Sequence, residues 1–283
     1  MDTKELCGLP FTKMTGSGND FVFFDGRQVS RALVTQPEAI RAICNRYNGI
    51  GADGLVVLEP RQDGADVEIH YFNSDGTPAD LCGNATLCST ALSAAVGLAE
   101  PSGMRLTTGA GLITSRIAPL PSGALPEIDF QPVTDIRPEM PIALATGERR
   151  VGYATAGIPH LVILCDDADA VDLSGRGPGL RWDPHTGAAG ANVNWVSARP
   201  SGGWRYRTFE RGVEGETLAC GTGAVATAVL LASWGLDEAP LVTIRTSSGR
   251  DLIVRLAPTA GGFQPTLQGE GRVVFHGQID ALG

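Results

Sequence analysis

The chain of 283 residues carries a formal net charge of −9, and 43% of its residues are hydrophobic. This length has room for two domains of about 140 residues, each with its own core. The negative charge and the lack of a Lys/Arg cluster argue against nucleic-acid binding, which needs a basic face. No apolar stretch of about 18 residues and no signal-peptide pattern is present, so we expect a cytoplasmic protein that does not span a membrane.

Residue patterns predict a strand-rich first half with two helices. A turn at 16–20 joins the first two strands, because Gly and Asn tolerate the left-handed backbone of tight turns. Composition predicts another turn at 73–76. The predicted strands are 12–14, 21–24, 54–58, 66–72, 104–107 and 112–117, and the predicted helices are 36–44 and the apolar run 87–98 after Cys82.

The second half predicts the same series of elements. The predicted strands are 161–164, 193–196, 204–209, 241–245, 252–256 and 272–275, with a helix at 224–234 after Cys220. Six prolines lie between Pro119 and Pro141, and we place the inter-domain linker in the second part of this segment. A second crossing is expected near 261–271. The predicted domains are therefore 1–134 with Cys82, 135–265 with Cys220, and a closing strand, 266–283, that returns to the first domain.

The two halves are copies of one duplicated unit, since four landmarks recur in one order at offsets of 138 or 139 residues. The period is too long for a solenoid repeat, so each copy should be a domain. An approximate two-fold axis would bring equivalent elements face to face across a cleft. The landmark pairs are Gly18 with Gly157, 51–53 with 190–192, Cys82 with Cys220, and 116–119 with 255–258.

Each half carries one helix that is apolar on nearly all sides. Such a helix is buried, so we expect each one inside a curved sheet with its N-terminus at the cleft. The predicted fold is α/β (α+β), with two pseudo-symmetric domains, each a curved and mostly antiparallel sheet around a central helix.

Six cysteines occur in a chain without an export signal, which favours free thiols over a disulfide framework. Cys44, Cys88 and Cys165 lie in apolar patterns that are typical of inert core residues. Four scattered histidines and the lack of a Cys-x-x-Cys pair argue against a metal site, and we expect none.

Cys82 and Cys220 each precede a glycine at the start of a helix. A helix N-terminus has unpaired N–H groups and roughly half a positive charge, so it lowers the pKa of a thiol and can hold a carboxylate. Two such helices meeting at their tips would hold one α-carboxylate with a sulfur on either side of the α-carbon. A thiolate would remove the α-proton and a thiol would deliver another from the opposite face, as in a two-base racemase.

Other roles for these residues stay open. A lone cysteine before a helix is more often a buried core residue, and two facing thiols could form a redox disulfide. A pyridoxal cofactor would need a Schiff-base lysine, but the chain has only Lys4 and Lys13, and neither follows a phosphate-binding loop. We therefore expect no cofactor.

The chain resembles the diaminopimelate epimerase family, whose members interconvert LL- and meso-diaminopimelate without a cofactor in lysine and peptidoglycan synthesis. The resemblance spans the whole chain in family order. The matching stretches are 13–21, 49–54, 72–76, 82–84, 190–194, 210–212 and 217–223.

The resemblance implies an isomerase in which Cys82 and Cys220 are the two acid/base residues. It also implies a set of substrate-binding residues, in which Glu can accept from an ammonium, Arg can pair with a carboxylate and Asn can do either. As alternatives, Asn73 and Asn192 are turn residues, Glu210 and Arg211 form a surface ion pair, and His160 is a core histidine. The implied contacts are Gly83, Asn84, Gly221 and Thr222 for the carboxylate, and Asn19, Asn73, Asn192, Glu210 and Arg211 for the distal group, with His160 as a contact or a support.

The chain departs from the family in three places. Ile158 replaces the Asn of Gly-Asn-Pro-His, Thr15 stands where His is usual, and 82–87 reads Cys-Gly-Asn-Ala-Thr-Leu in place of Cys-Gly-Asn-Gly-Ala-Arg. Loss of the amide at 158 removes a hydrogen bond worth roughly 1.5–3 kcal/mol, so affinity for diaminopimelate would fall by about one to two orders of magnitude unless other groups compensate.

Our first hypothesis is a diaminopimelate epimerase. The alternatives are a racemase of the same fold for another amino acid, such as histidine, and a non-catalytic thiol redox protein. The expected partner is a small amino-acid substrate, and neither nucleic acid nor a membrane is expected. The sequence leaves the oligomeric state open, with a homodimer as one option.

Overall fold

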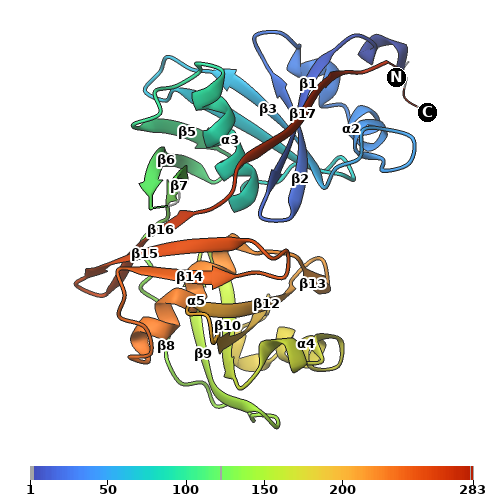
Figure 1. The fold of residues 1–283 in the computed structure, drawn as a ribbon. Coiled ribbons are helices and arrows are strands. Elements are labelled where there is room, and N and C mark those ends of the chain that lie inside the picture. The colour runs from blue at the N-terminus through green and yellow to red at the C-terminus, as the bar shows by residue number, and fades with distance from the viewer. Residues whose placement is uncertain (1–2, 122, 281, 283) are drawn as a thin grey trace. The chain divides into compact units, whose positions relative to one another are not determined.

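The computed structural model describes residues 3–121, 123–280 and 282. The chain divides into two compact units, which are Met1–Ile128 with Gly269–Gly283 and Asp129–Gln268 (Figure 1). The sequence placed the corresponding boundaries at 134/135 and 265/266. Among the described residues, no helix combines the length and the apolar character needed to cross a membrane.

The first unit is a set of strands around one long helix. The helix α3 (Gly83–Ala95) follows Cys82, and α2 (Pro37–Cys44) coincides with a predicted helix. The other elements are η1 (Thr3–Leu6), α1 (Arg31–Val34), β1 (Pro10–Gly16), β2 (Asn19–Asp25), β3 (Gly54–Pro60), β4 (Val67–Asn73), β5 (Met104–Thr108), β6 (Gly111–Leu120), β7 (Gly123–Asp129) and β17 (Arg272–Gln278).

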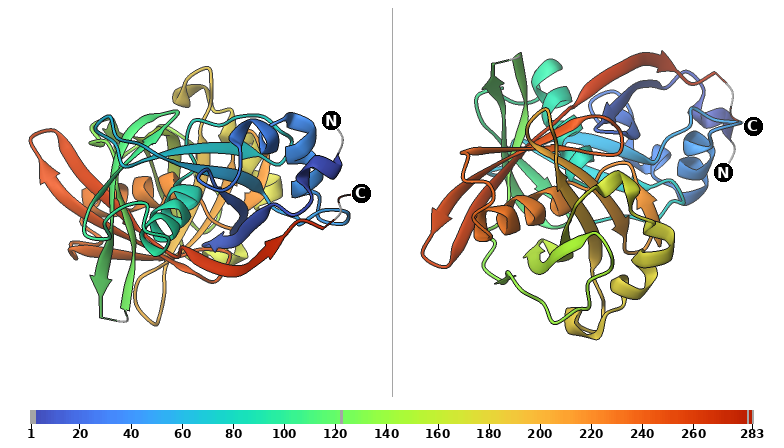
Figure 2. Two further views of the ribbon diagram at one scale, coloured as in Figure 1. Left: turned by 90° about the horizontal axis from the view of Figure 1, so that it is seen from above. Right: turned by 60° about the horizontal axis from the view of Figure 1, so that its bottom comes forward.

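Strand pairing in this unit is mostly antiparallel. β1 lies between β2 and β17 and is antiparallel to both, and the views in Figure 2 keep β17 beside β1. Two parallel pairs, β2 with β3 and β4 with β5, interrupt the antiparallel pairs β3–β4, β5–β6 and β6–β7. The β1–β2 turn places Ser17 and Gly18 at φ of 53° and 110°, in the left-handed region that the turn residues predict.

α3 packs on the inner faces of these strands. Its residues Cys88 and Leu92 join a buried cluster with Met14, Val56 and Leu106, contributed by β1, β3 and β5. At Gly16 a Cβ atom would lie 2.9 Å from the Asn84 carbonyl oxygen and 3.0 Å from Cys88 Sγ, so this glycine lets β1 approach the start of α3 closely. The central helix predicted for the first half is therefore confirmed.

The second unit repeats this plan. Its long helix, α5 (Gly221–Ser233), follows Cys220 and has the same length, 13 residues, as α3. The other elements are β8 (Ile136–Arg137), β9 (Glu148–Ala156), β10 (Ile158–Cys165), η2 (Ala168–Ala170), α4 (Leu173–Arg181), η3 (Pro184–Thr186), β11 (Asn192–Ala198), β12 (Trp204–Glu210), β13 (Gly215–Thr217), β14 (Leu241–Arg245), β15 (Asp251–Thr259) and β16 (Gly262–Gln268).

The strand directions of the two units correspond pair by pair. β9–β10 is antiparallel like β1–β2, β10–β11 is parallel like β2–β3, and β11–β12 is antiparallel like β3–β4. β12–β14 is parallel like β4–β5, and β14–β15 and β15–β16 are antiparallel like β5–β6 and β6–β7. The duplication in the sequence is thus a duplication of topology, and the predicted mixed α/β class is confirmed.

Several elements were not predicted. β7 occupies 123–129, in the first part of the proline-rich segment, and pairs with β6 even though it contains Pro126; the linker was expected in the second part, and the boundary between the two units falls at 128/129. The chain returns to the first unit at 268/269, inside the range 261–271 expected for the second crossing, and β16, which pairs with β15, fills the first part of that range. β9 begins with the charged run 148–150, and α4 contains three glycines and Pro178, so neither showed a clear periodic pattern.

Candidate active site

Cys82 is the N-cap residue of α3. Its backbone is extended, at φ −134° and ψ 117°, and its side chain does not cap the helix, so the thiol is directed elsewhere. The sulfur is partly exposed and hydrogen-bonds with the hydroxyl of Tyr71 on β4. The first N–H groups of α3 have no acceptor within the helix, as at any helix start, and can bind an anion.

An amide pair lies at the start of α3. Asn84 donates from Nδ2 to Asn19 Oδ1 at 2.7 Å, and Asn19 donates from Nδ2 to Asp53 Oδ2 at 3.1 Å. Asn84 is 3% exposed, and its Oδ1 has no hydrogen-bond partner. A buried oxygen without a donor is costly, so this atom is suited to accept a hydrogen bond from a ligand.

Ion pairs hold the loop behind this amide pair. Arg46 contacts Asp20 at 2.7 Å and Asp53 at 2.6 Å, and the buried Lys13 contacts Asp20 at 2.7 Å. Burial opposes ionisation of Asp20, but its hydrogen bonds with Arg46 and Lys13 prevail and lower its pKa to about 2. Lys13 also donates to the Gly51 carbonyl, so its amine serves the structure of this loop.

Asn73 ends β4 and bonds within its own turn. Its Nδ2 donates to Thr77 Oγ1 at 3.1 Å, and its backbone N–H donates to the Thr77 carbonyl. These bonds agree with the interpretation of Asn73 as a turn residue.

Cys220 is the N-cap residue of α5, with nearly the same backbone as Cys82, at φ −131° and ψ 111°. The residue is 8% exposed, and its sulfur contacts Thr222 Oγ1 at 3.3 Å and accepts from Asn192 Nδ2 at 3.7 Å. Burial, followed by the charge of Glu210, raises the pKa of the Cys220 thiol well above its usual value. The expectation that the helix start lowers this pKa is wrong for Cys220, because burial and a neighbouring carboxylate outweigh the donors around the sulfur.

Glu210 lies beside Cys220 and does not form the surface ion pair considered from the sequence. Its carboxylate accepts hydrogen bonds from Thr217 Oγ1 and from the Cys220 thiol, and its burial raises its pKa. Asn192 Oδ1 accepts from the backbone N–H of Arg211 at 2.9 Å, so the amide is fixed between this N–H group and the Cys220 sulfur. The second unit thus brings Asn192, Glu210, Cys220 and Thr222 together.

His160 is fully buried on β10, beside Asn192 in the strand register. Its Nδ1 lies 3.3 Å from Asn194 Nδ2, whereas its Nε2 has no partner. Burial and the charge of Arg211 lower the pKa of His160 to about 3, so the ring is neutral at physiological pH. This placement supports the interpretation of His160 as a support for the asparagines.

The sequence analysis missed a polar cluster beneath the start of α5. Asn194 Oδ1 accepts from Tyr206 Oη at 2.9 Å and from Thr208 Oγ1 at 3.0 Å, and Tyr206 also donates to the Cys220 carbonyl at 3.4 Å. A Cβ atom on Gly223 would lie 2.2 Å from Tyr206 Oη, so the helix passes directly over this cluster. The sequence feature that could have indicated this cluster is Asn194, a polar residue in a strand whose other residues are mainly apolar.

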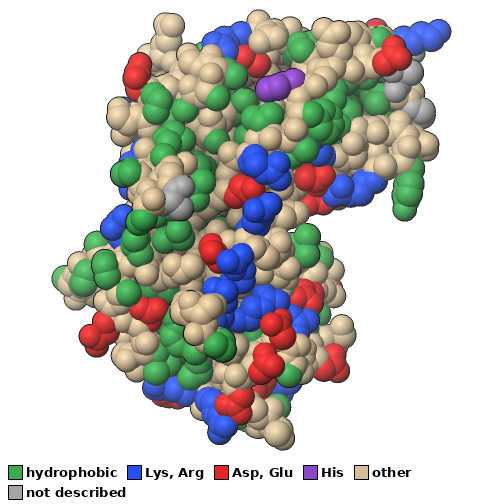
Figure 3. Space-filling model, viewed as in Figure 1, with side chains coloured by type: hydrophobic (Ala, Val, Ile, Leu, Met, Phe, Trp, Pro, Cys, Tyr) green, Lys and Arg blue, Asp and Glu red, His purple; other side chains and the backbone are tan. Residues whose placement is uncertain are grey.

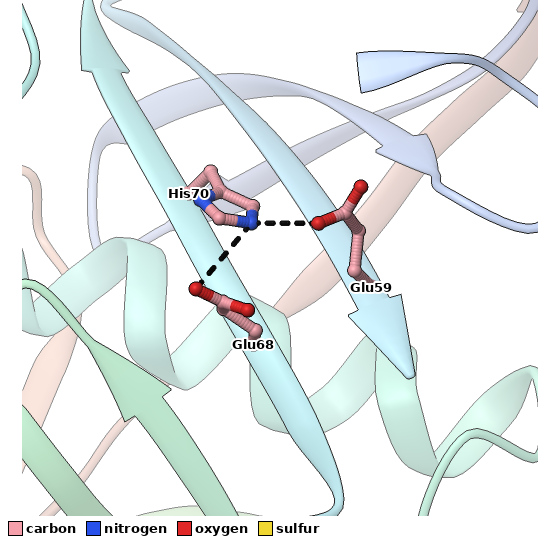
Figure 4. Close-up of side chains that lie close together, drawn as sticks. All are labelled: Glu59, Glu68 and His70. Atoms are coloured by element: carbon pink, nitrogen blue, oxygen red, sulfur yellow. Dashed lines mark hydrogen bonds and ion pairs between the residues drawn. The ribbon is translucent and has the colours of Figure 1, made fainter. Parts of the chain in front are cut away.

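Three side chains of types that bind metals, Glu59, Glu68 and His70, converge in the first unit (Figure 4). His70 Nε2 lies 2.9 Å from Glu59 Oε2 and 3.8 Å from Glu68 Oε1 on the paired strands β3 and β4. Arg31 contacts Glu59 and Arg61 contacts Glu68, so these carboxylates already have cationic partners. The arrangement is explained as an ion-pair network.

Charged side chains elsewhere are also paired. On the face shown in Figure 3, basic and acidic side chains lie next to one another in each unit. Examples in the second unit are Arg149 with Asp166 at 2.6 Å and Arg207 with Glu216 at 2.7 Å.

Known proteins resemble this chain over nearly its whole length. Residues 11–119 and 152–256 match the family model described as diaminopimelate epimerase. A diaminopimelate epimerase of Gemmatimonas aurantiaca is 71% identical over 282 residues, which cover 97% of this chain and 100% of that protein. A diaminopimelate epimerase of Sphingopyxis alaskensis is 38% identical and covers 95% of this chain and 97% of its own.

Solved structures share the fold at low sequence identity. A PhzF-family phenazine biosynthesis protein of Bacillus anthracis has a TM-score of 0.75 at 13% identity, covering 96% of this chain and 98% of its own. A hydroxyproline epimerase of Agrobacterium vitis has a TM-score of 0.63 at 19% identity, covering 96% and 92%.

Proposed function

The chain belongs to the diaminopimelate epimerase family, and from that premise we propose that it interconverts LL- and meso-diaminopimelate by cofactor-independent proton exchange at the α-carbon. One observation carries the mechanism: each unit begins its central helix at a cysteine that does not cap the helix. The name of the 71% identical relative supports the choice of substrate.

The substrate carboxylate binds the helix starts in this proposal. The backbone N–H groups of Gly83 and Asn84 in α3, and of Gly221 and Thr222 in α5, lie in the first turns, where helices leave donors unpaired. These donors stabilise the negative charge that develops on the carboxylate when the α-proton leaves.

The two cysteines act as base and acid on opposite faces of the α-carbon. In one direction the Cys82 thiolate takes the α-proton as the Cα–H bond breaks, and the Cys220 thiol gives its proton to the other face of the carbanion. The products are a Cys82 thiol, a Cys220 thiolate and the inverted substrate, and the reverse reaction exchanges these roles. The raised pKa of Cys220 agrees with its starting as the thiol.

Isotope exchange tests this function. In deuterated buffer under reducing conditions, we expect deuterium at the α-carbon of LL-diaminopimelate, together with formation of the meso form. Exchange into another amino acid such as histidine, with none into diaminopimelate, would contradict the substrate. The absence of exchange in any amino acid tested would contradict the reaction.

Ile158 offers a test of substrate recognition. It begins β10 beside Gly157, where an added Cβ atom would lie 3.8 Å from Thr222 Cγ2, so this turn lies against the first turn of α5. If diaminopimelate is the substrate, Ile158→Asn should lower KM for it by roughly tenfold or more, because a charge-assisted hydrogen bond is gained. Ile136→Asn, in β8, is the control and should leave KM unchanged.

A further inference from the structure

Tyr71 on β4 lies beside Cys82, and the proposed mechanism has not used it. The segment after β4 turns back along that strand, since the Ala79 N–H donates to the Tyr71 carbonyl at 3.1 Å and Phe72 forms a bridge with Pro78. This return brings Cys82 to the Tyr71 ring, and both residues pack against the same buried cluster.

The position of the Tyr71 ring is fixed by its neighbours. Phe21 packs edge-on against it, with centroids 6.0 Å apart and an interplanar angle of 79°. On the paired strand, a Cβ atom at Gly54 would lie 2.6 Å from the Phe72 carbonyl oxygen, 2.7 Å from Tyr71 Cε2 and 3.1 Å from Tyr71 Oη. Gly54 therefore provides the space that the phenol occupies next to the thiol.

The second unit also has a tyrosine beside its cysteine, and the hydroxyl there hydrogen-bonds with the Cys220 side chain as well as with other acceptors. Tyr206 donates to Asn194 Oδ1 at 2.9 Å and lies 3.4 Å from the Cys220 carbonyl. For Tyr71, the sulfur of Cys82 is the hydrogen-bond partner. Each tyrosine therefore contacts the cysteine side chain of its own unit, and Tyr206 also holds Asn194 and the backbone at the helix start.

We propose that Tyr71 is a positioning residue for Cys82, whose hydroxyl donates a hydrogen bond to Sγ, orients the sulfur and stabilises its thiolate form. This inference rests on the proposed function in taking Cys82 as an acid/base residue. Hydrogen bonds to charged acceptors are about twice as strong as neutral ones, so the donor favours the thiolate over the thiol.

The surroundings keep Tyr71 a donor. Burial, the charge of Cys82 and that of Asp53 raise the pKa of Tyr71 well above its usual value, so the phenol stays protonated. Cys88 in α3 also interacts electrostatically with Cys82, and burial raises the pKa of Cys88 well above the usual range, so it remains a neutral thiol. Among these groups, Asp53 contributes a negative charge, which opposes the thiolate, and Tyr71 contributes the stabilising hydroxyl.

Alkylation of Cys82 in the substrate-free protein tests the proposal. The rate of iodoacetamide labelling is followed from pH 5 to 10 by mass spectrometry of the Cys82 peptide. In Tyr71→Phe, which retains the ring, the midpoint of the pH profile should move up by about one unit, a tenfold change in the thiol–thiolate equilibrium. Tyr153→Phe is the matched control, because this buried tyrosine contacts Thr155 and not a cysteine.

A second variant covers the case in which Tyr71→Phe does not fold. Gly54→Ala adds a methyl group where the phenol lies, and it should raise the midpoint in the same direction. An unchanged midpoint in a folded Tyr71→Phe or Gly54→Ala protein, or an equal shift in Tyr153→Phe, would overturn the role of Tyr71. Because no substrate is present, this result is separate from the isotope-exchange test of function.

Discussion

The Cys82 and Cys220 sites share one backbone plan but differ in electrostatics. Both cysteines are N-cap residues of 13-residue helices with nearly equal φ and ψ. Each cysteine side chain hydrogen-bonds with a neutral tyrosine, but Cys82 is partly exposed, whereas Cys220 is buried beside the Glu210 carboxylate. A duplicated fold can thus place two equivalent sulfurs in different surroundings, and the burial and carboxylate at Cys220 favour the thiol, the form that donates a proton in the proposed inversion.

Removing either sulfur should have the largest effect. Cys82→Ala and Cys220→Ala each delete an acid/base group, and such groups contribute roughly 10²–10⁴-fold to rate, so we expect turnover to fall to background. Cys88→Ala is the control, since this buried thiol lies in the core cluster and should leave the rate nearly intact. An active Cys220→Ala enzyme would refute the two-base mechanism.

The second prediction removes the charge that distinguishes the two sites. Glu210 raises the pKa of Cys220, so Glu210→Gln should lower it and move the alkaline limb of the kcat/KM profile down by about one pH unit. Glu216→Gln removes a carboxylate paired with Arg207 on the neighbouring strand and serves as the control. An alkaline limb that stays in place in Glu210→Gln would show that Cys220 does not set it.

A third comparison concerns the residue three positions after each cysteine. Gly223 follows Cys220, and an added Cβ atom would lie 2.6 Å from Asn194 Oδ1, whereas Ala85 follows Cys82 and is already buried. Gly223→Ala should lower the free energy of unfolding by about 1–3 kcal/mol through overpacking. Ala85→Gly should cost only about 1 kcal/mol, the usual difference in helix propensity. Urea denaturation measures both, and equal losses would contradict the close approach at Gly223.

Sequence reasoning predicted the parts of this molecule that depend on local pattern and repetition. The two apolar helices, the turn at 16–20 and the cysteines at the helix starts follow from residue spacing, and each recurs in the second half. β7 and β9 were missed because cross-strand pairing stabilises them despite Pro126 and the charged start at Glu148.

The side-chain contacts within each site were harder to predict from the sequence. Tyr71 meets Cys82 only because Gly54 on the paired strand leaves room, and Tyr206 meets Asn194 across two strands. Such contacts depend on strand register, which no local motif encodes. The sign of the Cys220 pKa shift was also wrong from sequence, because the depth of burial was not known.

The last prediction again separates the two units. Gly157 is followed after three residues by the buried His160, while Gly18 is followed at the same distance by Phe21, which cannot titrate. The pKa of His160 is about 3 in the folded chain and about 6.5 when unfolded. Below pH 6.5 the unfolded state therefore binds the extra proton, and the free energy of unfolding falls as the pH drops toward 3.

Once the histidine of the unfolded chain is protonated, the free energy of unfolding falls by about 1.4 kcal/mol for each unit by which the pH drops. Urea denaturation at several values between pH 6.5 and 4 should show the wild-type chain losing more stability than His160→Gln, because the variant lacks the titrating ring. Carboxylates that titrate in this range affect both proteins alike, so the difference between them isolates His160. Parallel curves of stability against pH would mean that the His160 ring is protonated as readily in the folded state as in the unfolded state. That result would contradict the role of a neutral His160 as a support for Asn194.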